Sequence, residues 1–213
     1  GSVMSEILAI DRDNPDESVL QRAAGVARSG GLVVYPTETL YGIGADATNR
    51  AAIRKVHEAK KRMEPKPVLV IVDSVEMMLP YVLGVSPSAR ILMEKLWPGP
   101  LTLVFKASEL VSSELVQGTG TIGIRIPSSR LCLRLLAHLS VPLTSTSANS
   151  TGEKPARTIK EIRERLTGID LYLDAGELPE SQPSTVVDVS GDVPRVLRRG
   201  AVTIDQLKQM QCT

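Results

Sequence analysis

The chain has 213 residues, of which 42% are hydrophobic, 23% are charged and 3% are aromatic, and its net charge is +1. This length can bury a sizeable core in one large domain, and no apolar run reaches the ~18–20 residues that span a bilayer. The low net charge and the few aromatic side chains argue against a surface devoted to nucleic acid and against a platform for stacking single-stranded RNA bases.

The start of the chain and its cysteines are typical of a reduced, cytoplasmic protein. Gly1-Ser2-Val3 before Met4 resembles a cloning remnant, and the basic-then-apolar pattern of a secretory signal is missing. Cys132 and Cys212 are the only cysteines and lie far apart, which indicates neither a disulfide framework nor a zinc site. We therefore expect a cytoplasmic protein without a membrane segment.

The first half of the chain predicts alternating helices and strands. Asn14 is expected to cap a helix, with Pro15 in its first turn and Glu17 three residues on, and Gly30-Gly31 is expected to end it. In chain order, we expect a helix from 14 to about 29, a strand over 32–35, a helix over 49–61, a strand over 68–72, and a helix that Ser86-Pro87 opens and Trp97-Pro98-Gly99-Pro100 stops.

The second half continues this alternation, with capping boxes at Thr158-x-x-Glu161 and Thr203-x-x-Gln206. In chain order, we expect strands over 101–105 and 122–126, a helix from Ser128 or Ser129 to 139, a strand over 141–144, a helix after Thr158, strands over 171–173, 185–189 and 195–197, and a closing helix after Thr203. The Pro-, Ser- and Glu-rich segment 176–184 is a candidate mobile flap.

The alternation of strands and helices predicts an α/β fold. Several consecutive strands have no helix between them, which predicts a twisted sheet of mixed parallel and antiparallel strands with helices packed on it. The sequence contains neither an internal repeat nor a low-complexity linker, so residues 1–213 are expected to form a single domain.

Two polar segments follow apolar strands without an evident packing reason. Thr37-Glu38-Thr39 follows a strand end, where open α/β sheets place ligands, although a local turn bonded by threonine is an alternative. Ser145-Thr146-Ser147-Ala148-Asn149 offers small donors suited to phosphate oxygens, a metal-bound water or an amide, although a plain Ser/Thr turn competes. The pattern predicts a phosphate-handling site assembled from distant loops.

Cations gather in the segment 54–66, which has six Lys or Arg residues against two Glu residues. Such a patch suits a polyphosphate or an RNA backbone, and a solvated helix face is the competing interpretation. Lys60 and Arg62 lie near a helix end, where cations also stabilise the helix dipole. Arg125 differs, because it interrupts an apolar strand and needs an anion, a carboxylate partner or a route to the sheet edge.

The common nucleotide and nucleophile motifs are missing from the sequence. It contains neither G-x-x-x-x-G-K-[ST] nor G-x-G-x-x-G. His57 and His138 fall within expected helices, where a lone histidine is usually structural. No Ser/His/Asp or Cys/His arrangement is evident.

Eight segments in order resemble the motifs of one family, the YrdC-like threonylcarbamoyl-AMP synthases. The resemblance covers about Asn14 to Gly200, and the ordered set is far more specific than any one segment. The segments are 35–44 (YPTETLYGIG), Lys60-x-Arg62, Lys66-Pro67, 97–102 (WPGPLT), 123–127 (GIRIP), 146–149 (TSAN), 184–188 (STVVD) and 197–200 (LRRG). The chain looks like the short, single-domain form of the family, with a YrdC-like fold.

The resemblance implies that L-threonine, bicarbonate and ATP react to give threonylcarbamoyl-adenylate and pyrophosphate. The product would pass to a threonylcarbamoyl transferase complex that modifies an adenosine beside the anticodon of certain tRNAs. Threonine would capture carbon dioxide as a carbamate, whose oxygen attacks the α-phosphorus of ATP. Because both reactants are anionic, positioning and electrostatic stabilisation would do most of the catalysis.

The resemblance also implies a role for individual residues. Lys60, Arg62 and Lys66 would hold the triphosphate together with Mg²⁺, and Lys60, Arg62, Ser147 and Asn149 would form the catalytic group. The residues expected to contact ATP are Lys60, Arg62, Lys66, Thr121, Ser147, Asn149 and Arg198. The residues expected to hold L-threonine are Thr37 or Thr39, Arg125, Ser145 and Ser184, with Arg125 pairing the carboxylate as a fork.

The chain departs from the family pattern at three places, which are Met63-Glu64, Ile71 and Ser150-Thr151-Gly152. Ile71 stands where some relatives carry a histidine directed at threonine. Two other functions stay open. One is a paralogue of the same fold without synthase activity, and the other is a module that contacts double-stranded RNA through the segment 54–66.

Overall fold

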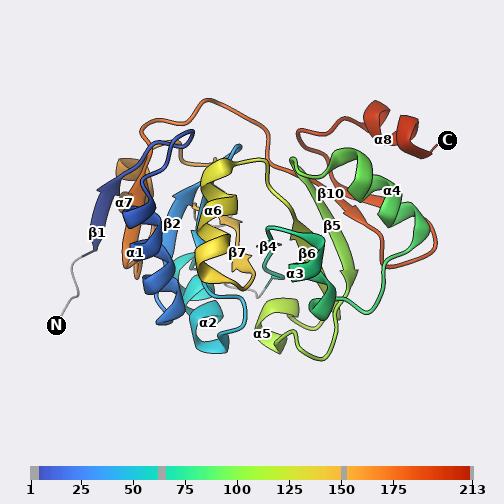
Figure 1. Cartoon of the computed structure of the whole chain (residues 1–213), viewed down its shortest axis with the longest axis horizontal. Helices are drawn as coiled ribbons and strands as arrows, with labels where there is room; N and C mark the ends of the chain where they lie inside the picture. Colours follow the sequence, from blue (N-terminus) through green and yellow to red (C-terminus); the bar gives the residue numbers. More distant parts are fainter. Residues whose placement is uncertain (1–4, 62–65, 150–152, 212–213) are drawn as a thin grey trace.

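The structure is a computed structural model that describes residues 5–61, 66–149 and 153–211 (Figure 1). The helices are α1 (Glu17–Arg28), α2 (Arg50–Ala59), α3 (Val75–Met78), α4 (Pro87–Leu96), α5 (Ser113–Val116), α6 (Arg130–Leu139), α7 (Ile159–Arg165) and α8 (Ile204–Gln211), with a 3₁₀ turn over Leu79–Tyr81. Among the described residues, no helix is long and apolar enough to cross a membrane. The predicted α/β class is confirmed.

The strands form two mixed sheets, where the sequence suggested one. The strands are β1 (Glu6–Ala9), β2 (Val33–Pro36), β3 (Tyr41–Gly44), β4 (Val70–Ile71), β5 (Leu101–Lys106), β6 (Thr121–Arg125), β7 (Leu143–Thr144), β8 (Thr146–Ser147), β9 (Leu171–Asp174), β10 (Thr185–Asp188) and β11 (Arg195–Arg198). One sheet has the order β1-β9-β2-β3-β8 and the other β11-β10-β5-β6-β4-β7. Each contains both parallel and antiparallel pairs, as predicted.

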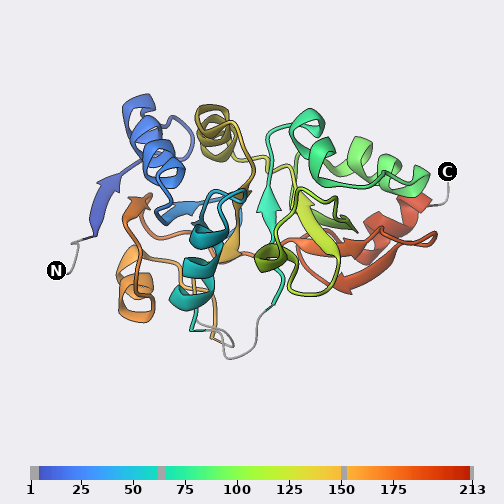
Figure 2. The same ribbon diagram turned by 90° about the horizontal axis from the view of Figure 1, so that it is seen from below.

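The two sheets lie side by side along the long axis of the molecule. Elements β1, α1, β2 and α7 lie toward one end, whereas β5, β10, α4 and α8 lie toward the other (Figure 1). The view from below shows the same separation, with the first strand and the last helix at opposite ends (Figure 2). The pairing is non-local, because Leu171 of β9 pairs with both Glu6 and Val33.

The segment 143–147 joins the two sheets. Its first strand, β7, belongs to the six-stranded sheet, and its second, β8, belongs to the five-stranded sheet, so Ser145 is the residue between them. The Ser145 N–H donates to the Leu69 carbonyl at 2.8 Å, and the Thr144 N–H donates to the Ala45 carbonyl at 2.9 Å. The Ser/Thr-rich segment, expected to be a turn, is therefore the crossing point between the sheets.

Side-chain caps place most helix starts where the sequence predicted them. Ser86 and Ser129 cap α4 and α6, and Thr158 caps α7 by accepting from the Glu161 N–H at 3.2 Å. The expected cap at Asn14 is wrong. Asp16 caps α1 instead, because its carboxylate accepts the N–H groups of the second and third helical residues, at 2.8 and 3.3 Å.

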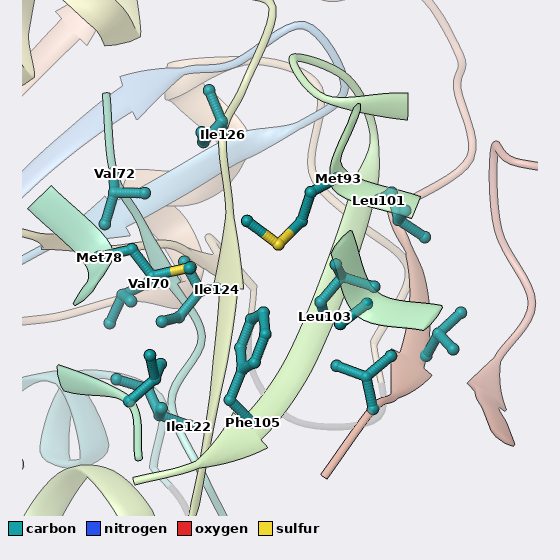
Figure 3. Packing of buried hydrophobic residues seen from close by; sticks show 14 of the residues in the cluster. Val70, Val72, Met78, Met93, Leu101, Leu103, Phe105, Ile122, Ile124 and Ile126 are labelled. Atoms are coloured by element: carbon teal, nitrogen blue, oxygen red, sulfur yellow. The ribbon is translucent and has the colours of Figure 1, made fainter. Parts of the chain in front are cut away.

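The core beside the site is built on β5 and β6. Figure 3 shows Phe105 and Leu103 packed with Ile122 and Ile124, together with Met93 from α4. These side chains are buried, with Phe105 only 1% exposed. Burial of an aromatic or aliphatic side chain stabilises the fold by roughly 1.5–3 kcal/mol. The cluster therefore gives β6 a rigid base from which Arg125, at its end, projects.

Candidate functional site

A cavity of about 480 Å³ opens where the two sheets meet, a volume typical of small-molecule sites. It brings together nine of the twelve predicted site residues, from segments far apart in the chain. These residues are Thr37, Thr39, Lys60, Lys66, Arg125, Ser145, Ser147, Ser184 and Arg198. The prediction that distant loops assemble one polar site therefore agrees with where the structure places them.

Three predicted residues are not among those that line the cavity. Thr121 begins β6, about 13 Å from Arg125 at 3.3 Å per residue, and its hydroxyl donates to the Thr119 hydroxyl at 3.1 Å. The Asn149 side chain lies just beyond Ser147 and donates to the Glu153 carbonyl at 2.7 Å. Arg62 lies outside the described residues, as do Met63-Glu64 and Ser150-Thr151-Gly152.

Lys60 connects two of the predicted segments directly. It follows the last residue of α2 and is only 5% exposed, and its Nζ donates to the Ser147 carbonyl at 2.8 Å. A buried ammonium is costly unless it is hydrogen-bonded and close to negative charge. Lys60 and Ser147 are 87 residues apart in sequence, so this contact is made only by the tertiary fold.

The Thr37 hydroxyl stabilises the turn between β2 and β3. Its Oγ donates to the Leu40 carbonyl at 2.7 Å and accepts the N–H groups of Thr39 and Leu40 at 3.1 and 3.0 Å. This is the local turn bonded by threonine that the sequence allowed as an alternative to a ligand site. Because the Thr37 hydroxyl is saturated by backbone, Thr39 is the better candidate of the two to meet a ligand.

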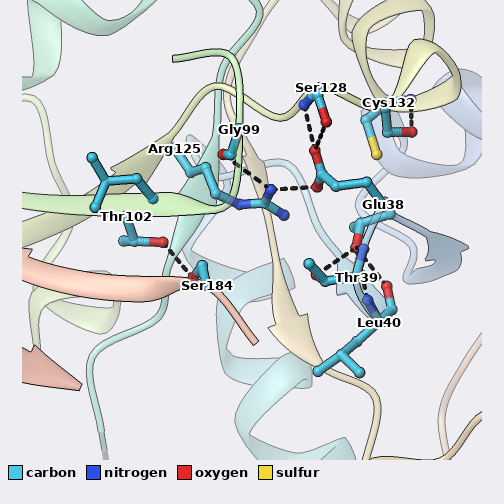
Figure 4. A network of polar contacts seen from close by, with 12 residues as sticks. Glu38, Thr39, Leu40, Gly99, Thr102, Arg125, Ser128, Cys132 and Ser184 are labelled. Carbon is cyan, nitrogen blue, oxygen red and sulfur yellow. Dashed lines mark hydrogen bonds and ion pairs between the residues drawn. The ribbon is translucent and has the colours of Figure 1, made fainter. Parts of the chain in front are cut away.

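Arg125 is paired with a carboxylate inside the protein. Its side chain is 6% exposed, and its Nη1 donates to Glu38 and, at 3.4 Å, to the Gly99 carbonyl (Figure 4). The other Glu38 oxygen accepts the Ser128 N–H and the Ser128 hydroxyl, the latter at 2.7 Å. Burial disfavours the charged form of Glu38, but Arg125 and Ser128 outweigh it and hold the Glu38 pKa below its ordinary value.

The opposite wall joins β5, β10 and β11 through side chains. The Thr102 and Ser184 hydroxyls are 2.7 Å apart and buried. Arg198 donates from Nε and Nη2 to the Ser184 carbonyl at 3.1 and 2.8 Å, and from Nη2 to the Ser184 hydroxyl at 3.0 Å. Burial lowers the pKa of Arg198, and the positive charge of Arg125 lowers it further, so the two guanidinium groups are close enough to repel.

Ser181 and Gly176 tie the candidate flap to the turn and strand beside the cavity. The Ser181 hydroxyl donates to the Thr39 carbonyl at 2.7 Å, and the Tyr41 hydroxyl donates to the Gly176 carbonyl at the same distance. Pro183 and Ser184, at the end of the segment, line the cavity. That the segment moves as a flap stays a prediction.

The cavity is strongly positive. Its lining includes Lys60, Lys66, Arg125 and Arg198, and the described lining residues include no Asp or Glu. Like charges that converge on one space stabilise an anion there. Within the described part of the chain, no cluster of His, Cys, Asp and Glu side chains is suited to hold a metal ion without help from a ligand.

The basic segment 54–66 does not form one free surface. The Arg54 guanidinium pairs with Glu114 at 3.3 Å, and the Lys55 ammonium donates to the Gly30 carbonyl at 3.0 Å. Lys60 and Lys66 instead line the cavity. Most described cations of this segment are thus committed to local contacts or to the cavity, which favours the polyphosphate interpretation over an RNA-binding face.

Glu38, Thr102 and Ser128 take part in the site, although none of them was predicted to bind a substrate. Glu38 stood in the polar segment after the first buried strand, and Thr102 lay within a family-like segment, but nothing in the sequence singled out Ser128 or identified Glu38 as the partner of Arg125. Their partners are 87, 90 and 82 residues away, so spacing along the chain carries no hint of the contacts.

Comparisons with known proteins agree with this arrangement. The family model Sua5_yciO_yrdC, described as telomere recombination, matches residues 25–200. A threonylcarbamoyl-AMP synthase of Thiobacillus denitrificans is 37% identical over 164 residues, which are 76% of this chain and 87% of the relative. A threonylcarbamoyl-AMP synthase of Pyrococcus abyssi is 32% identical over 200 residues, which are 93% of this chain.

A solved structure resembles the fold closely. The crystal structure of P. abyssi Sua5 complexed with L-threonine superposes with a TM-score of 0.91 at 31% identity, over 97% of this chain and 61% of that one. The chain spans 59% of the length of the Pyrococcus synthase.

Proposed function

The chain belongs to the Sua5–YciO–YrdC family, and from this membership we propose that it is an L-threonylcarbamoyladenylate synthase. In this reaction the threonine amine attacks carbon dioxide derived from bicarbonate, and the resulting carbamate oxygen attacks the α-phosphorus of ATP. The bond between the α-phosphorus and its bridging oxygen breaks, and pyrophosphate leaves. The observation that carries the proposal is the contact of Lys60 with Ser147 in a cavity lined by four cations.

The ATP phosphates are assigned to the end of the cavity near Lys60. Lys60 and Lys66 supply positive charge at this end, and the Ser147 hydroxyl supplies a neutral donor. Arg198, which bonds Ser184 and lies close to Arg125, keeps its assignment to ATP as a charge between the two ends. Cations and donors fixed in place before the reaction stabilise the charge that develops on the phosphates without reorganising. Arg62, Thr121 and Asn149 keep their assignment to ATP as predictions, with Asn149 shaping the turn beyond Ser147.

Threonine is assigned to the end of the cavity near Arg125. Glu38 and Gly99 occupy Nη1, so Nε and Nη2 are the Arg125 donors left to pair with the substrate carboxylate. The Thr39, Ser145 and Ser184 hydroxyls are the polar groups assigned to the amine and the side-chain hydroxyl. Arg125 would thereby orient the amine toward the α-phosphate, and orientation contributes a large share of such catalysis.

Magnesium fits this cavity as a companion of ATP. Mg²⁺ usually keeps several waters and binds substrate phosphates with one or two protein oxygens. The Ser147 hydroxyl is a protein oxygen that would join its shell, as a Ser or Thr hydroxyl does in other nucleotide sites. When bound, Mg²⁺ would neutralise phosphate charge.

Several broader assignments accompany the synthase proposal. The product is a reactive mixed anhydride, so a threonylcarbamoyl transferase complex acting on tRNA would have to consume it, and we place the protein in the cytoplasm with these partners. A paralogue without synthase activity is the second candidate, because the description of the family model that matches residues 25–200 does not name synthase activity. Direct contact with duplex RNA stays a prediction.

Pyrophosphate release from the purified protein tests the proposal. Release should require ATP, threonine and bicarbonate together, and serine should replace threonine poorly. Release without threonine would contradict the proposal and indicate a different activity. Tight ATP binding without any release would favour the paralogue.

A further inference from the structure

Glu38 places a negative charge directly against one of the cations of the cavity. Its carboxylate lies between Arg125 and Ser128, and Figure 4 shows it beside the guanidinium group. Glu38 is not among the residues that line the cavity, whereas Arg125 is. The carboxylate, whose side chain is 19% exposed, therefore acts on the cavity through its contact with Arg125.

The Glu38 carboxylate is held in place from several sides. Ser128 donates to it from its backbone N–H and its hydroxyl, and Ser128 precedes the capped start of α6. The turn that carries Glu38 is closed by the Thr37 hydroxyl. Because both the turn and the helix start are fixed, the negative charge cannot swing away from Arg125 without breaking these bonds.

Without Glu38, the Arg125 end of the cavity would suit phosphate. Arginine pairs equally well with carboxylate and phosphate groups, and Arg125 and Arg198 converge on the same space. An uncompensated pair of arginines would attract an anion of higher charge more strongly than a single carboxylate. The cavity has to receive a polyphosphate at one end only, so this attraction would misplace ATP.

With Glu38 present, the charge of one of the two guanidinium groups at this end is balanced, and Arg125 still offers hydrogen-bond donors. Within the described residues, Nε and Nη2 of Arg125 make no hydrogen bond. A zwitterion gains these bonds through its carboxylate, and its ammonium or amine is favoured by the nearby negative charge. A phosphate gains the same bonds, but its additional negative charge is repelled by the Glu38 carboxylate that pairs with Arg125.

We propose that Glu38 is a specificity residue that balances Arg125, so that this end of the cavity accepts a zwitterionic amino acid and rejects phosphate. The phosphates are thereby confined to the end with Lys60 and Lys66. This inference rests on the proposed function, because it assumes that one ligand is an amino acid and the other a nucleoside triphosphate.

Calorimetric titration of threonine, with inorganic phosphate as the probe, tests the role of Glu38 without requiring turnover. In the unaltered protein, phosphate should weaken ATP binding but leave threonine binding unchanged. In Glu38→Gln, phosphate should compete with threonine and, at a concentration that leaves the unaltered protein unaffected, raise the apparent dissociation constant of threonine by about 10-fold or more. Glu114→Gln is the matched control, because Glu114 pairs with Arg50 and Arg54 outside the cavity, and its phosphate response should stay within about 2-fold of the unaltered protein.

Three results decide between the possibilities. Competition of phosphate with threonine in the unaltered protein would overturn the inference, and this arm holds even where Glu38→Gln fails to fold. A folded Glu38→Gln protein that binds threonine less tightly, with an unchanged response to phosphate, would also overturn it, because Glu38 would then only position Arg125. Absence of threonine binding in the unaltered protein would instead contradict the proposed function itself.

Discussion

Replacing Arg125 by methionine tests where threonine binds. The substitution removes the charge and the two donors, Nε and Nη2, left for the substrate carboxylate, while it keeps most of the apolar stem. Each hydrogen bond to a charged group contributes about 1.5–3 kcal/mol, and partial solvation favours the lower end. A loss of about 3 kcal/mol corresponds to a KM for threonine raised about 100-fold.

Pyrophosphate release measured over a threonine titration, at saturating ATP and bicarbonate, gives this KM. The KM for ATP, measured at saturating threonine, should change less than about 3-fold, because the phosphates are assigned to the other end of the cavity. Arg195→Met is the matched control, since Arg195 is 75% exposed and pairs with Asp188 outside the cavity. Equal losses for both substrates, or no loss for either, would refute the reasoning.

The same variant has a structural cost that must be separated from the loss of binding. Arg125→Met leaves the Glu38 carboxylate, whose side chain is 19% exposed, without its arginine. Breaking a fully buried pair costs about 3–5 kcal/mol, and the cost here should be lower because Ser128 still donates to the carboxylate. The double variant Arg125→Met, Glu38→Gln removes the stranded charge and should recover part of this stability in thermal unfolding. Its threonine affinity should remain low, because the donors are still missing. Recovered threonine affinity would mean that Arg125 acts only through the fold.

Three further predictions follow from single contacts. Lys60→Met should lower kcat/KM for ATP by about 100-fold or more. The control Lys61→Met, at the exposed neighbouring residue, should change kcat/KM less than about 2-fold. Equal effects of the two substitutions would contradict the role of Lys60. Thr37→Val should lower the free energy of unfolding by about 1–3 kcal/mol in denaturant titrations, because two backbone N–H groups lose their acceptor. An unchanged unfolding midpoint would contradict the stabilising role of the Thr37 hydroxyl in this turn. Because the pKa of Glu38 is lowered in the folded protein, its charge stabilises the fold at pH values above 4.5, the ordinary pKa of a glutamate. This contribution disappears as the pH falls through the lowered folded-state pKa. Below pH 4.5, Glu38→Gln should therefore lose stability less steeply than the unaltered protein.

Local signals predicted the secondary structure well. The capping box at Thr203 is complete, whereas at Thr158 the hydroxyl caps the helix but Glu161 accepts from that hydroxyl instead of from the Thr158 N–H. Both caps form because a side chain three residues from its backbone partner needs no tertiary contact. Asn14 failed as a cap because Asp16, two residues later, is an equally good capping residue. Strands β3 and β8 were not predicted, since each is short and exists only through its partners.

The sequence by itself determined which chemical groups the site contains. Arg125 in an apolar strand indicated that an anion or a carboxylate lies nearby. The family-like segments contain most of the lysines, serines and threonines that line the cavity. These conclusions depend on residue type and short spacing, which the chain displays directly.

Only the tertiary structure decided which of these groups meet. Lys60 bonds Ser147, and Arg125 bonds Glu38, each across 87 residues, and the segment 143–147 crosses between two sheets that the sequence did not separate. Such contacts depend on the packing of whole sheets, whose pairing partners lie far apart in the chain. The sequence therefore indicated phosphate-handling chemistry, whereas the tertiary structure determined that Arg125 pairs with the Glu38 carboxylate.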